Sequence, residues 1–270
     1  MMGLVFALLS VGVTNGVLVF DSRDVERVII NIGPNMLPAL PHREKTQVIA
    51  IEPMVGCSLM SRFKDVKELH IVNAAVAANS TLQWMNWYHG QGESSSLSTP
   101  TVRATWNMGP RNNRGPRVVN VISMKDVLES IPENVELWYL KTDMQGFDFQ
   151  ALVAGADELK RAHYVLTEVW WDNVQSYGGV NNDFCRHHFP FMRSMGFEVL
   201  RAEDGYETDD LEDNPGISQI NGLSQDEIKA LCDTKRDLPR LKGSMEGDVF
   251  WKRSDTTLEP PTWREAQENP

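Results

Sequence analysis

Five short apolar segments, each followed by polar, acidic or glycine residues, constrain the fold of this chain most. They span residues 28–35, 48–53, 71–76, 140–148 and 165–169. Strands buried on both faces of a parallel sheet have this continuous apolar character. The carboxyl ends of such strands meet at one sheet edge, where open α/β sheets bind their ligands. The sequence therefore predicts an α/β enzyme with a small-molecule site along one edge of a parallel sheet.

The length and charge of the chain narrow this prediction further. A chain of 270 residues is long enough for one large α/β domain. The net charge of −11 and the lack of a basic run argue against nucleic acid as a partner, because the phosphates would be repelled. We therefore predict a small-molecule substrate and no nucleic-acid partner.

The cysteines and histidines show no spacing typical of a metal site or a disulfide framework. Cys57, Cys185 and Cys232 are odd in number and widely separated, and no Cys-x-x-Cys pair occurs. The six histidines form no His-x-x-x-His pattern. We expect three buried or half-buried thiols and predict no metal site.

The first twenty residues allow two interpretations. Residues 1–20 carry no charged side chain, and residues 4–13 are almost continuously apolar. A secretory signal or membrane anchor has such an apolar core, but the usual basic residues before it are missing. The alternative is a buried first segment that packs against the sheet. The compartment stays open, cytoplasm or secretory pathway, and we expect membrane contact only if this segment is an anchor.

After this segment we expect a single domain over residues 21–255 and a proline-containing, disordered tail over 256–270. The predicted strands are 28–31, 48–51, 69–73, 81–88, 137–142, 164–169, 197–200 and 247–253. The predicted helices are 55–63, 124–131, 149–161, 184–195 and 225–234, with Ser123 and Ser224 as N-caps of the second and last. Residues 90–117, rich in glycine, proline, serine and asparagine, are predicted to form a long loop.

A glycine and an acid predict a nucleoside-binding site. Gly33 directly follows the first strand, where a missing Cβ lets the backbone approach a ligand. Glu52 ends the second strand about twenty residues later, the spacing at which an acid can accept both hydroxyls of a ribose. The segment matches neither Gly-x-Gly-x-x-Gly nor the P-loop, which favours a cofactor without phosphates. The alternative is a tight turn beside a solvated acid.

These segments together resemble the FkbM family of S-adenosylmethionine-dependent methyltransferases. The most specific similarity is the sequence Lys-Thr-Asp-Met-Gln-Gly-Phe-Asp at 141–148, followed by Leu152 and Gly155-Ala156. Residues 28–35, 49–53, 73–76, 94–97 and 247–253 and Glu168 also match the family. The resemblance implies a Rossmann-like, mostly parallel seven-stranded sheet with an antiparallel last strand and helices on both faces. It also implies O-methylation of a hydroxyl on a sugar or other small natural product.

The resemblance further assigns residues to the cofactor, S-adenosyl-L-methionine. The positions implied are Asn31, Gly33, Asn35, Glu52 and Asn73. The chain departs from the family where Asn31 replaces an acid, Pro34 an alanine and Leu37 a glycine, and where Gln145 replaces a glutamate. These departures support an alternative hypothesis, a non-catalytic binding protein that keeps the methyltransferase fold.

Methyl transfer to an alcohol needs a base, and Asp143 is our candidate because it follows the fourth predicted strand at the ligand edge. Its pKa would have to be raised by burial, whereas pairing with Lys141 would lower it. His89 is the alternative base.

Candidate substrate contacts follow the fifth predicted strand. Glu168, Trp170 and Trp171 lie at its end, and the indole rings could bind the apolar face of a sugar or another ring. The alternative is that the tryptophans pack beneath a loop. A magnesium site made by Asp143, Asp172 and Asn173 is a weaker hypothesis.

Overall fold

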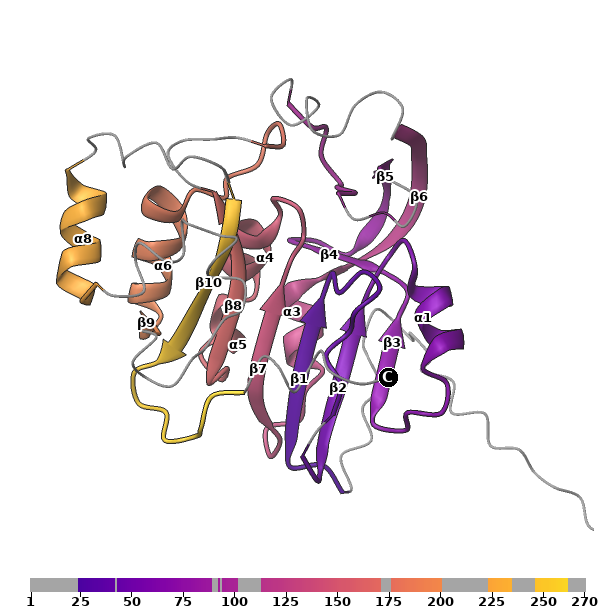
Figure 1. Cartoon of the computed structure of the whole chain (residues 1–270), viewed down its shortest axis with the longest axis horizontal. Coiled ribbons are helices and arrows are strands. Elements are labelled where there is room, and N and C mark those ends of the chain that lie inside the picture. Colours follow the sequence, from indigo (N-terminus) through magenta and orange to yellow (C-terminus); the bar gives the residue numbers. More distant parts are fainter. Residues whose placement is uncertain are drawn as a thin grey trace, which may run out of the picture.

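The structure is a computed structural model, and it describes residues 24–41, 43–88, 92, 94–101, 113–170, 176–200, 223–234 and 246–261 (Figure 1). The predicted segment 1–20, residues 201–222 and the last residues of the predicted tail lie outside this part. Within the described residues, no helix is both long and apolar enough to cross a membrane.

Seven strands form the central sheet, in the spatial order β3-β2-β1-β7-β8-β10-β9. Their bounds are Arg27–Ile32 (β1), Thr46–Ile51 (β2), Leu69–Val72 (β3), Glu136–Thr142 (β7), Tyr164–Trp170 (β8), Phe197–Val199 (β9) and Glu246–Arg253 (β10). The pairs among β3, β2, β1, β7 and β8 are parallel, and β10 is antiparallel to both β8 and β9. This confirms the predicted Rossmann-like sheet with an antiparallel last strand.

Alternate residues of the strands pack on opposite faces of this sheet, as the two-residue period of a strand requires. On β1, Ile30 belongs to the larger hydrophobic cluster and Ile29 to the cluster on the other face. The larger cluster includes side chains from α3 (Met124–Glu129), α4 (Asp148–Ala154), α5 (Ala156–Leu159), η2 (Phe184–His188), α6 (Phe189–Ser194) and α8 (Gln225–Asp233). The other cluster includes Leu59 of α1 (Gly56–Arg62). Helices therefore cover both faces, as predicted.

A second, three-stranded sheet lies beyond the carboxyl edge of the first (Figure 1). It has the order β4-β6-β5, with β4 Ala75–Ala77, β5 Thr81–Tyr88 and β6 Asn113–Ser123. The predicted strand 81–88 is present, but the prediction that residues up to 117 form a loop was wrong for 113–117. Antiparallel pairing with β5 holds this stretch in a strand despite Gly115 and Pro116. Pairing between distant segments outweighs local composition here.

The helix caps follow the local signals in the sequence. The Ser123 side chain accepts a hydrogen bond from the Asp126 amide, and Ser224 and Glu227 form a reciprocal capping box. The predicted helix 149–161 is divided at Gly155 into α4 and α5, and the predicted helix 184–195 begins as the π-helix η2 before α6.

Two predictions for the ends and cysteines of the domain need correction. Cys185 of η2 and Cys232 of α8 form a disulfide, so the prediction of three free thiols was wrong; Cys57 is free and exposed. The predicted tail is packed as far as 261, because Glu259 and Leu258 carbonyls accept hydrogen bonds from the Trp138 indole and the Tyr164 hydroxyl. The packing of the helices and the path of the chain bring these residues together. Their spacing in the sequence does not show this.

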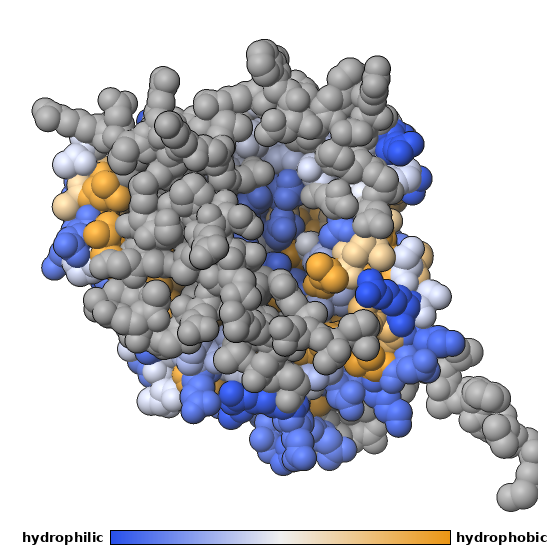
Figure 2. All heavy atoms as spheres, viewed as in Figure 1, coloured by the Kyte–Doolittle hydropathy of each residue, from blue (hydrophilic) through white to orange (hydrophobic). Residues whose placement is uncertain are grey.

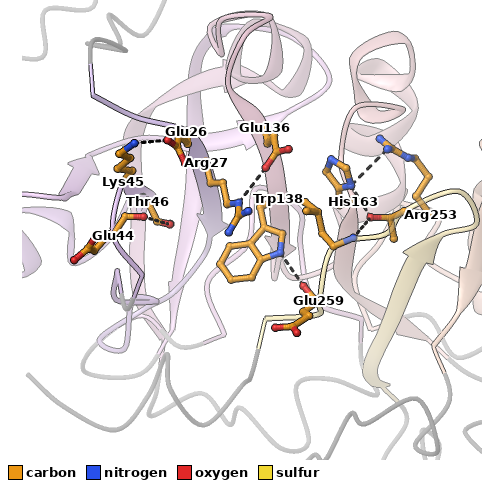
Figure 3. Close-up of polar contacts among 12 residues, drawn as sticks. Glu26, Arg27, Glu44, Lys45, Thr46, Glu136, Trp138, His163, Arg253 and Glu259 are labelled. Atoms are coloured by element: carbon orange, nitrogen blue, oxygen red, sulfur yellow. Dashed lines mark hydrogen bonds and ion pairs between the residues drawn. The ribbon is translucent and has the colours of Figure 1, made fainter.

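Polar contacts tie this C-terminal segment to the amino edge of the sheet (Figure 3). Arg27 pairs with Glu136 at 3.0 Å, and the Arg27 and Arg43 guanidinium groups lie 5.7 and 4.9 Å from the centroid of the Trp138 ring. Arg43 also pairs with Glu259. These contacts lie at the edge of the sheet opposite the predicted ligand site.

Candidate active site

A cavity of about 250 Å³ lies at the carboxyl ends of β1, β2 and β7. The strand order reverses between β1 and β7, and open α/β sheets bind ligands at this kind of switch point. The cavity is lined by Ile32, Gly33, Asn35, Ile51, Glu52, Pro53, Met54, Ala75, Val76, Met85, Gly92, Ser95, Leu97, Asp143, Met144 and Gln145. The predicted convergence of Gly33, Glu52 and Asp143 on one crevice is thus confirmed.

Gly33 is required by the meeting of two chain segments at the cavity wall. Its φ is +69°, and a Cβ at this position would lie 1.9 Å from the carbonyl oxygen of Asp143. The Gly33 amide donates to the Ile51 carbonyl, and the Asp143 amide donates to the Ile32 carbonyl. The missing side chain therefore lets the turn after β1 pack directly on the turn after β7, whereas the sequence suggested only room for a ligand.

Glu52 is almost fully buried at the end of β2 and holds the neighbouring turns through its carboxylate. One oxygen accepts the Asn35 amide at 3.1 Å, and the other accepts the amides of Met54 at 2.6 Å and Val55 at 3.3 Å. Burial raises the pKa of Glu52, and these three hydrogen bonds oppose that shift. A carboxylate has about four acceptor positions, so Glu52 retains capacity for a ligand hydroxyl at the cavity wall.

Asp143 is hydrogen-bonded to Gln145, which in turn is hydrogen-bonded to Tyr177. The Gln145 amide nitrogen donates to the Asp143 carboxylate at 2.8 Å, and the Gln145 amide oxygen lies 2.8 Å from the Tyr177 hydroxyl. Burial raises the pKa of Asp143, while Lys141 and then Gln145 lower it. Both influences that the sequence suggested, burial and Lys141, therefore act on this carboxyl, and burial has the larger effect.

The backbone of Gln145 is held in an uncommon conformation. Its φ is 52°, a left-handed value that few non-glycine residues adopt, and the following Gly146 has φ 95°. The Ser96 hydroxyl donates to the Gln145 carbonyl at 2.9 Å. A Cβ on Gly146 would lie 2.7 Å from the Trp170 ring, so this turn packs against the indole.

Asp148 is a second buried acid close to the site. It has no solvent exposure and accepts a hydrogen bond from the Met144 amide at 3.2 Å. Burial, and then the charge of Asp143, raises its pKa to about 7. Asp148 lies in the first turn of α4, and its hydrogen bond with the Met144 amide ties that turn to the segment that carries Gln145.

The other predicted cofactor residues lie at or beyond the edge of the cavity. Asn35 lines it, but Asn31 is buried and its side-chain oxygen accepts the Ala39 amide at 2.7 Å, so it holds the turn after β1. Asn73 is exposed, and its amide nitrogen donates to the backbone carbonyls of Glu52 and Pro53, both at 3.1 Å. Neither Asn31 nor Asn73 is among the residues that line the cavity.

The predicted substrate residues are placed differently. Trp170 is 2% exposed, stacks on Tyr177 with ring centroids 6.3 Å apart, and does not line the cavity, which matches the alternative of packing beneath a loop. Glu168 is also buried and does not line it, and lies opposite Asp248 of β10. His89, Trp171, Asp172 and Asn173 lie outside the described residues. The structure therefore brings neither Trp170 nor Glu168 to the ligand site.

Sequence reasoning missed the wall contributed by the second sheet and the segment after it. Met85 of β5, and Ser95 and Leu97, line the cavity. Residues 94–101 are tied down by hydrogen bonds to Gln145, to Gly178 and, through Thr101, to Ser176. The run of serines at 94–96 indicates hydrogen bonds made by hydroxyl groups. The sequence does not identify their partners, because residues such as Gln145 are distant in the chain.

The lining of the cavity is acidic and largely apolar. Glu52 and Asp143 are its ionisable residues, and among the described lining residues none is lysine or arginine. The rest of the wall is largely apolar, with side chains such as Met54, Val76 and Leu97. Within the described part of the chain no cluster of histidine, cysteine or acidic residues could hold a metal. Such a cavity suits a ligand with an apolar ring, hydroxyls and positive charge, and disfavours phosphates.

The surface around this region includes exposed apolar side chains. Figure 2 shows hydrophobic residues among hydrophilic ones on the part of this face where β2, β3 and α1 lie. Leu37, in the turn after β1, is 62% exposed, and Met60 of α1 is 42% exposed. Leu37 stands where the resemblance expects a glycine, so this departure places an apolar side chain on the surface, outside the cavity lining.

The fold and the site define a Rossmann-like protein of the methyltransferase type. The chain belongs to the FkbM methyltransferase family, because the family model for the methyltransferase FkbM domain matches residues 31–199. This confirms the family resemblance seen in the sequence. No curated protein matches the chain.

One solved structure similar to this chain is methyltransferase FkbM from Methylobacillus flagellatus KT. The two chains share 12% sequence identity, and their TM-score is 0.31. The match covers 54% of this chain and 33% of that one, so this chain matches about a third of the length of that protein.

Proposed function

We propose that this chain binds S-adenosyl-L-methionine in the cavity and transfers its methyl group to a hydroxyl of a sugar or another small natural product. The supporting observation is the meeting of Gly33, Glu52 and Asp143 around one cavity that has acidic but no basic residues among its described lining. The cofactor carries a cationic sulfur and an ammonium group and no phosphate. Opposite charge favours its binding in such a cavity.

The residues present fit this cofactor. Glu52, buried at the wall with acceptor capacity left, would take a ribose hydroxyl. Met54, Val76 and Leu97 would contact the adenine ring. The turn of Gly33 to Asn35 would face the methionine moiety, without the carboxylate that Asn31 replaces. The bound cofactor supplies an electrophilic methyl carbon on a positively charged sulfur.

Asp143 would accept the proton of the acceptor hydroxyl while the oxygen attacks the methyl carbon. Burial raises the pKa of Asp143, which makes the carboxylate a stronger base than one in water. Its position at the cavity wall lets it contact an acceptor held near the methyl group. The largely apolar wall would disfavour water that competes for the methyl group.

Titration calorimetry of the full-length protein with S-adenosylhomocysteine tests the cofactor assignment. We expect one site per chain and no binding of NAD⁺, which carries phosphates. The methyl transfer is then tested with S-adenosylmethionine and a panel of hydroxyl compounds, with S-adenosylhomocysteine formation as the readout. Absence of S-adenosylhomocysteine binding would overturn the cofactor assignment. Tight binding without transfer to any panel member would favour the non-catalytic alternative.

A further inference from the structure

Gln145 connects the candidate base to a buried tyrosine from a distant part of the chain. Its amide nitrogen donates to the Asp143 carboxylate at 2.8 Å, and its amide oxygen lies 2.8 Å from the Tyr177 hydroxyl. That hydroxyl also lies 3.0 Å from the Ser94 carbonyl oxygen. Both neighbours of the hydroxyl are acceptors, so it divides a single proton between them. The chain of contacts runs from Asp143 to the backbone of Ser94.

Packing and hydrogen bonds hold Gln145 and Tyr177 in place. Tyr177 is 2% exposed and stacks on Trp170, and Trp170 packs against Gly146, the next residue after Gln145. The Ser96 hydroxyl holds the Gln145 carbonyl, which keeps the left-handed backbone in place. A residue in so restricted a conformation persists only where its surroundings determine it, and such residues concentrate at functional sites. The side-chain amide therefore has little freedom except rotation about its own terminal bond.

We propose that Gln145, backed by Tyr177, is a positioning residue that orients the Asp143 carboxyl group in both of its protonation states. With Asp143 ionised, the amide nitrogen donates to the carboxylate and the Tyr177 hydroxyl donates to the amide oxygen. With Asp143 protonated, a half-turn of the amide lets its oxygen accept the Asp143 proton. The amide nitrogen then donates to the Tyr177 oxygen, and the Tyr177 proton goes to the Ser94 carbonyl. The Asp143 carboxyl, the Gln145 amide and the Tyr177 hydroxyl therefore keep a hydrogen-bond partner in each state.

An amide can do this because it is both donor and acceptor, whereas an ionised glutamate only accepts. The glutamate that the family resemblance expects at Gln145 would place a second carboxylate against Asp143. Gln145 is therefore a specific part of this site. The link to catalysis rests on the proposed function, in which Asp143 takes up a proton and must later release it.

The pKa of Asp143 gives a readout that needs neither cofactor nor acceptor. The charged groups around Asp143 are Lys141 on β7, Glu52 after β2 and Asp148 on α4. Removing the Gln145 donor leaves these charges in place. Both protonation states lose a hydrogen bond to Gln145, but the bond to the charged form is the stronger of the two, so the pKa of Asp143 should rise.

The experiment is carbon-13 NMR of the full-length protein with labelled aspartate carboxyls, with Asp143→Asn to assign the signal. For Gln145→Met we expect the Asp143 titration midpoint to rise by about 1 pH unit, the difference between a hydrogen bond lost by the charged form and one lost by the protonated form. Gln145→Glu should raise it through like charge, and Tyr177→Phe should raise it by less. Tyr88→Phe is the matched control, since Tyr88 is buried in the same cluster and should leave the midpoint unchanged.

An Asp143 midpoint that is the same in wild type, Gln145→Met and Tyr177→Phe would overturn the proposal. If Gln145→Met does not fold, Tyr177→Phe decides alone, because it keeps the ring that packs on Trp170. Calorimetry with S-adenosylhomocysteine is read separately. Shifted midpoints in a protein that binds no S-adenosylhomocysteine would support the positioning of Asp143 and refute the proposed function.

Discussion

The backbone of Gly33 packs directly against the carbonyl oxygen of Asp143, so the turn after β1 and the candidate base share one wall. A Cβ at Gly33 would come within 1.9 Å of that oxygen, far inside any real contact. The positive φ of Gly33 adds a second reason why only glycine fits. The turn after β1 thus has a structural role in placing Asp143, in addition to any contact with a ligand.

Gly33→Ala should destabilise the protein strongly, because the new methyl group must push the two turns apart. Gly179→Ala is the matched control: Gly179 also has a positive φ, of 76°, but a Cβ there would meet no atom within 4 Å. We expect the control to lose only the conformational cost of about 1–2 kcal/mol. Gly33→Ala should lose clearly more free energy of unfolding, measured by urea denaturation. Equal losses would show that the two turns can separate easily.

Replacing Glu52 should weaken cofactor binding. Glu52→Gln keeps the shape of the side chain but puts an NH₂ group where backbone amides donate, and removes the charge at the ribose position. We expect S-adenosylhomocysteine affinity to fall by about 1.5–3 kcal/mol, or about 10- to 150-fold, in calorimetry. Glu68→Gln changes an exposed glutamate just before β3, at the amino edge of the sheet, and should bind as wild type. Equal affinities of the two variants would remove Glu52 from the site.

The features that the sequence predicted are those that local pattern and topology determine. The apolar runs of β1, β2, β7 and β8 are strands because residues buried on both sheet faces must be apolar. Ser123 and Ser224 cap helices through contacts only three residues away. Gly33, Glu52 and Asp143 converge because all parallel strands end at one edge, a consequence of connectivity that needs no side-chain detail.

The features that it did not predict depend on contacts between distant residues. β6 is a strand because β5 pairs with it, although its own Gly115 and Pro116 favour a loop. The Cys185–Cys232 disulfide joins residues 47 positions apart, and their proximity follows from how α8 packs. From the sequence, Trp170 could have faced either a ligand or the core. Its stacking on Tyr177 shows that it packs in the core. Spacing alone carries none of this information.

Asp143→Asn should separate chemistry from binding. Asparagine keeps the shape of the side chain and can still accept a hydrogen bond from Gln145, but it cannot take up the acceptor proton. We expect S-adenosylhomocysteine affinity to survive, while turnover of an alcohol acceptor falls ~10²–10⁴-fold, as for loss of a general base. Full turnover would exclude Asp143 as the base and make His89 the next residue to test.

The disulfide should stabilise the attachment of α8. Beyond the disulfide, α8 is held by the buried Ile228 and by two hydrogen bonds between Gln225 and the Val199 backbone. Cys232→Ser should lower the free energy of unfolding by about 2–4 kcal/mol, the usual range for one disulfide, and speed hydrogen exchange in α8. Cys57→Ser, at the exposed free cysteine, should change neither. Three reactive thiols in the native protein by mass spectrometry would contradict the pairing.

Two buried groups should give opposite pH dependences of stability. Burial raises the pKa of Asp148 to about 7, so from about pH 4 to 7 the folded state holds a proton that the unfolded state has released, and stability falls as pH rises. Burial lowers the pKa of His188 to about 3, so from about pH 3 to 6.5 the unfolded state holds the extra proton, and stability rises with pH. The two contributions oppose each other between about pH 4 and 6.5 in the wild type.

Removing either group should therefore reveal the pH dependence of stability that the other group contributes. In urea unfolding between about pH 4.5 and 6.5, Asp148→Asn should gain stability with rising pH relative to the wild type. His188→Gln, which can still donate to Asn182 as His188 Nε2 does at 2.9 Å, should lose stability with rising pH. The double variant should return to a slope near that of the wild type, because both contributions are then absent. If all four proteins have the same pH slope, neither group has a shifted pKa in the folded state, and Asp148 is not held protonated beside Asp143.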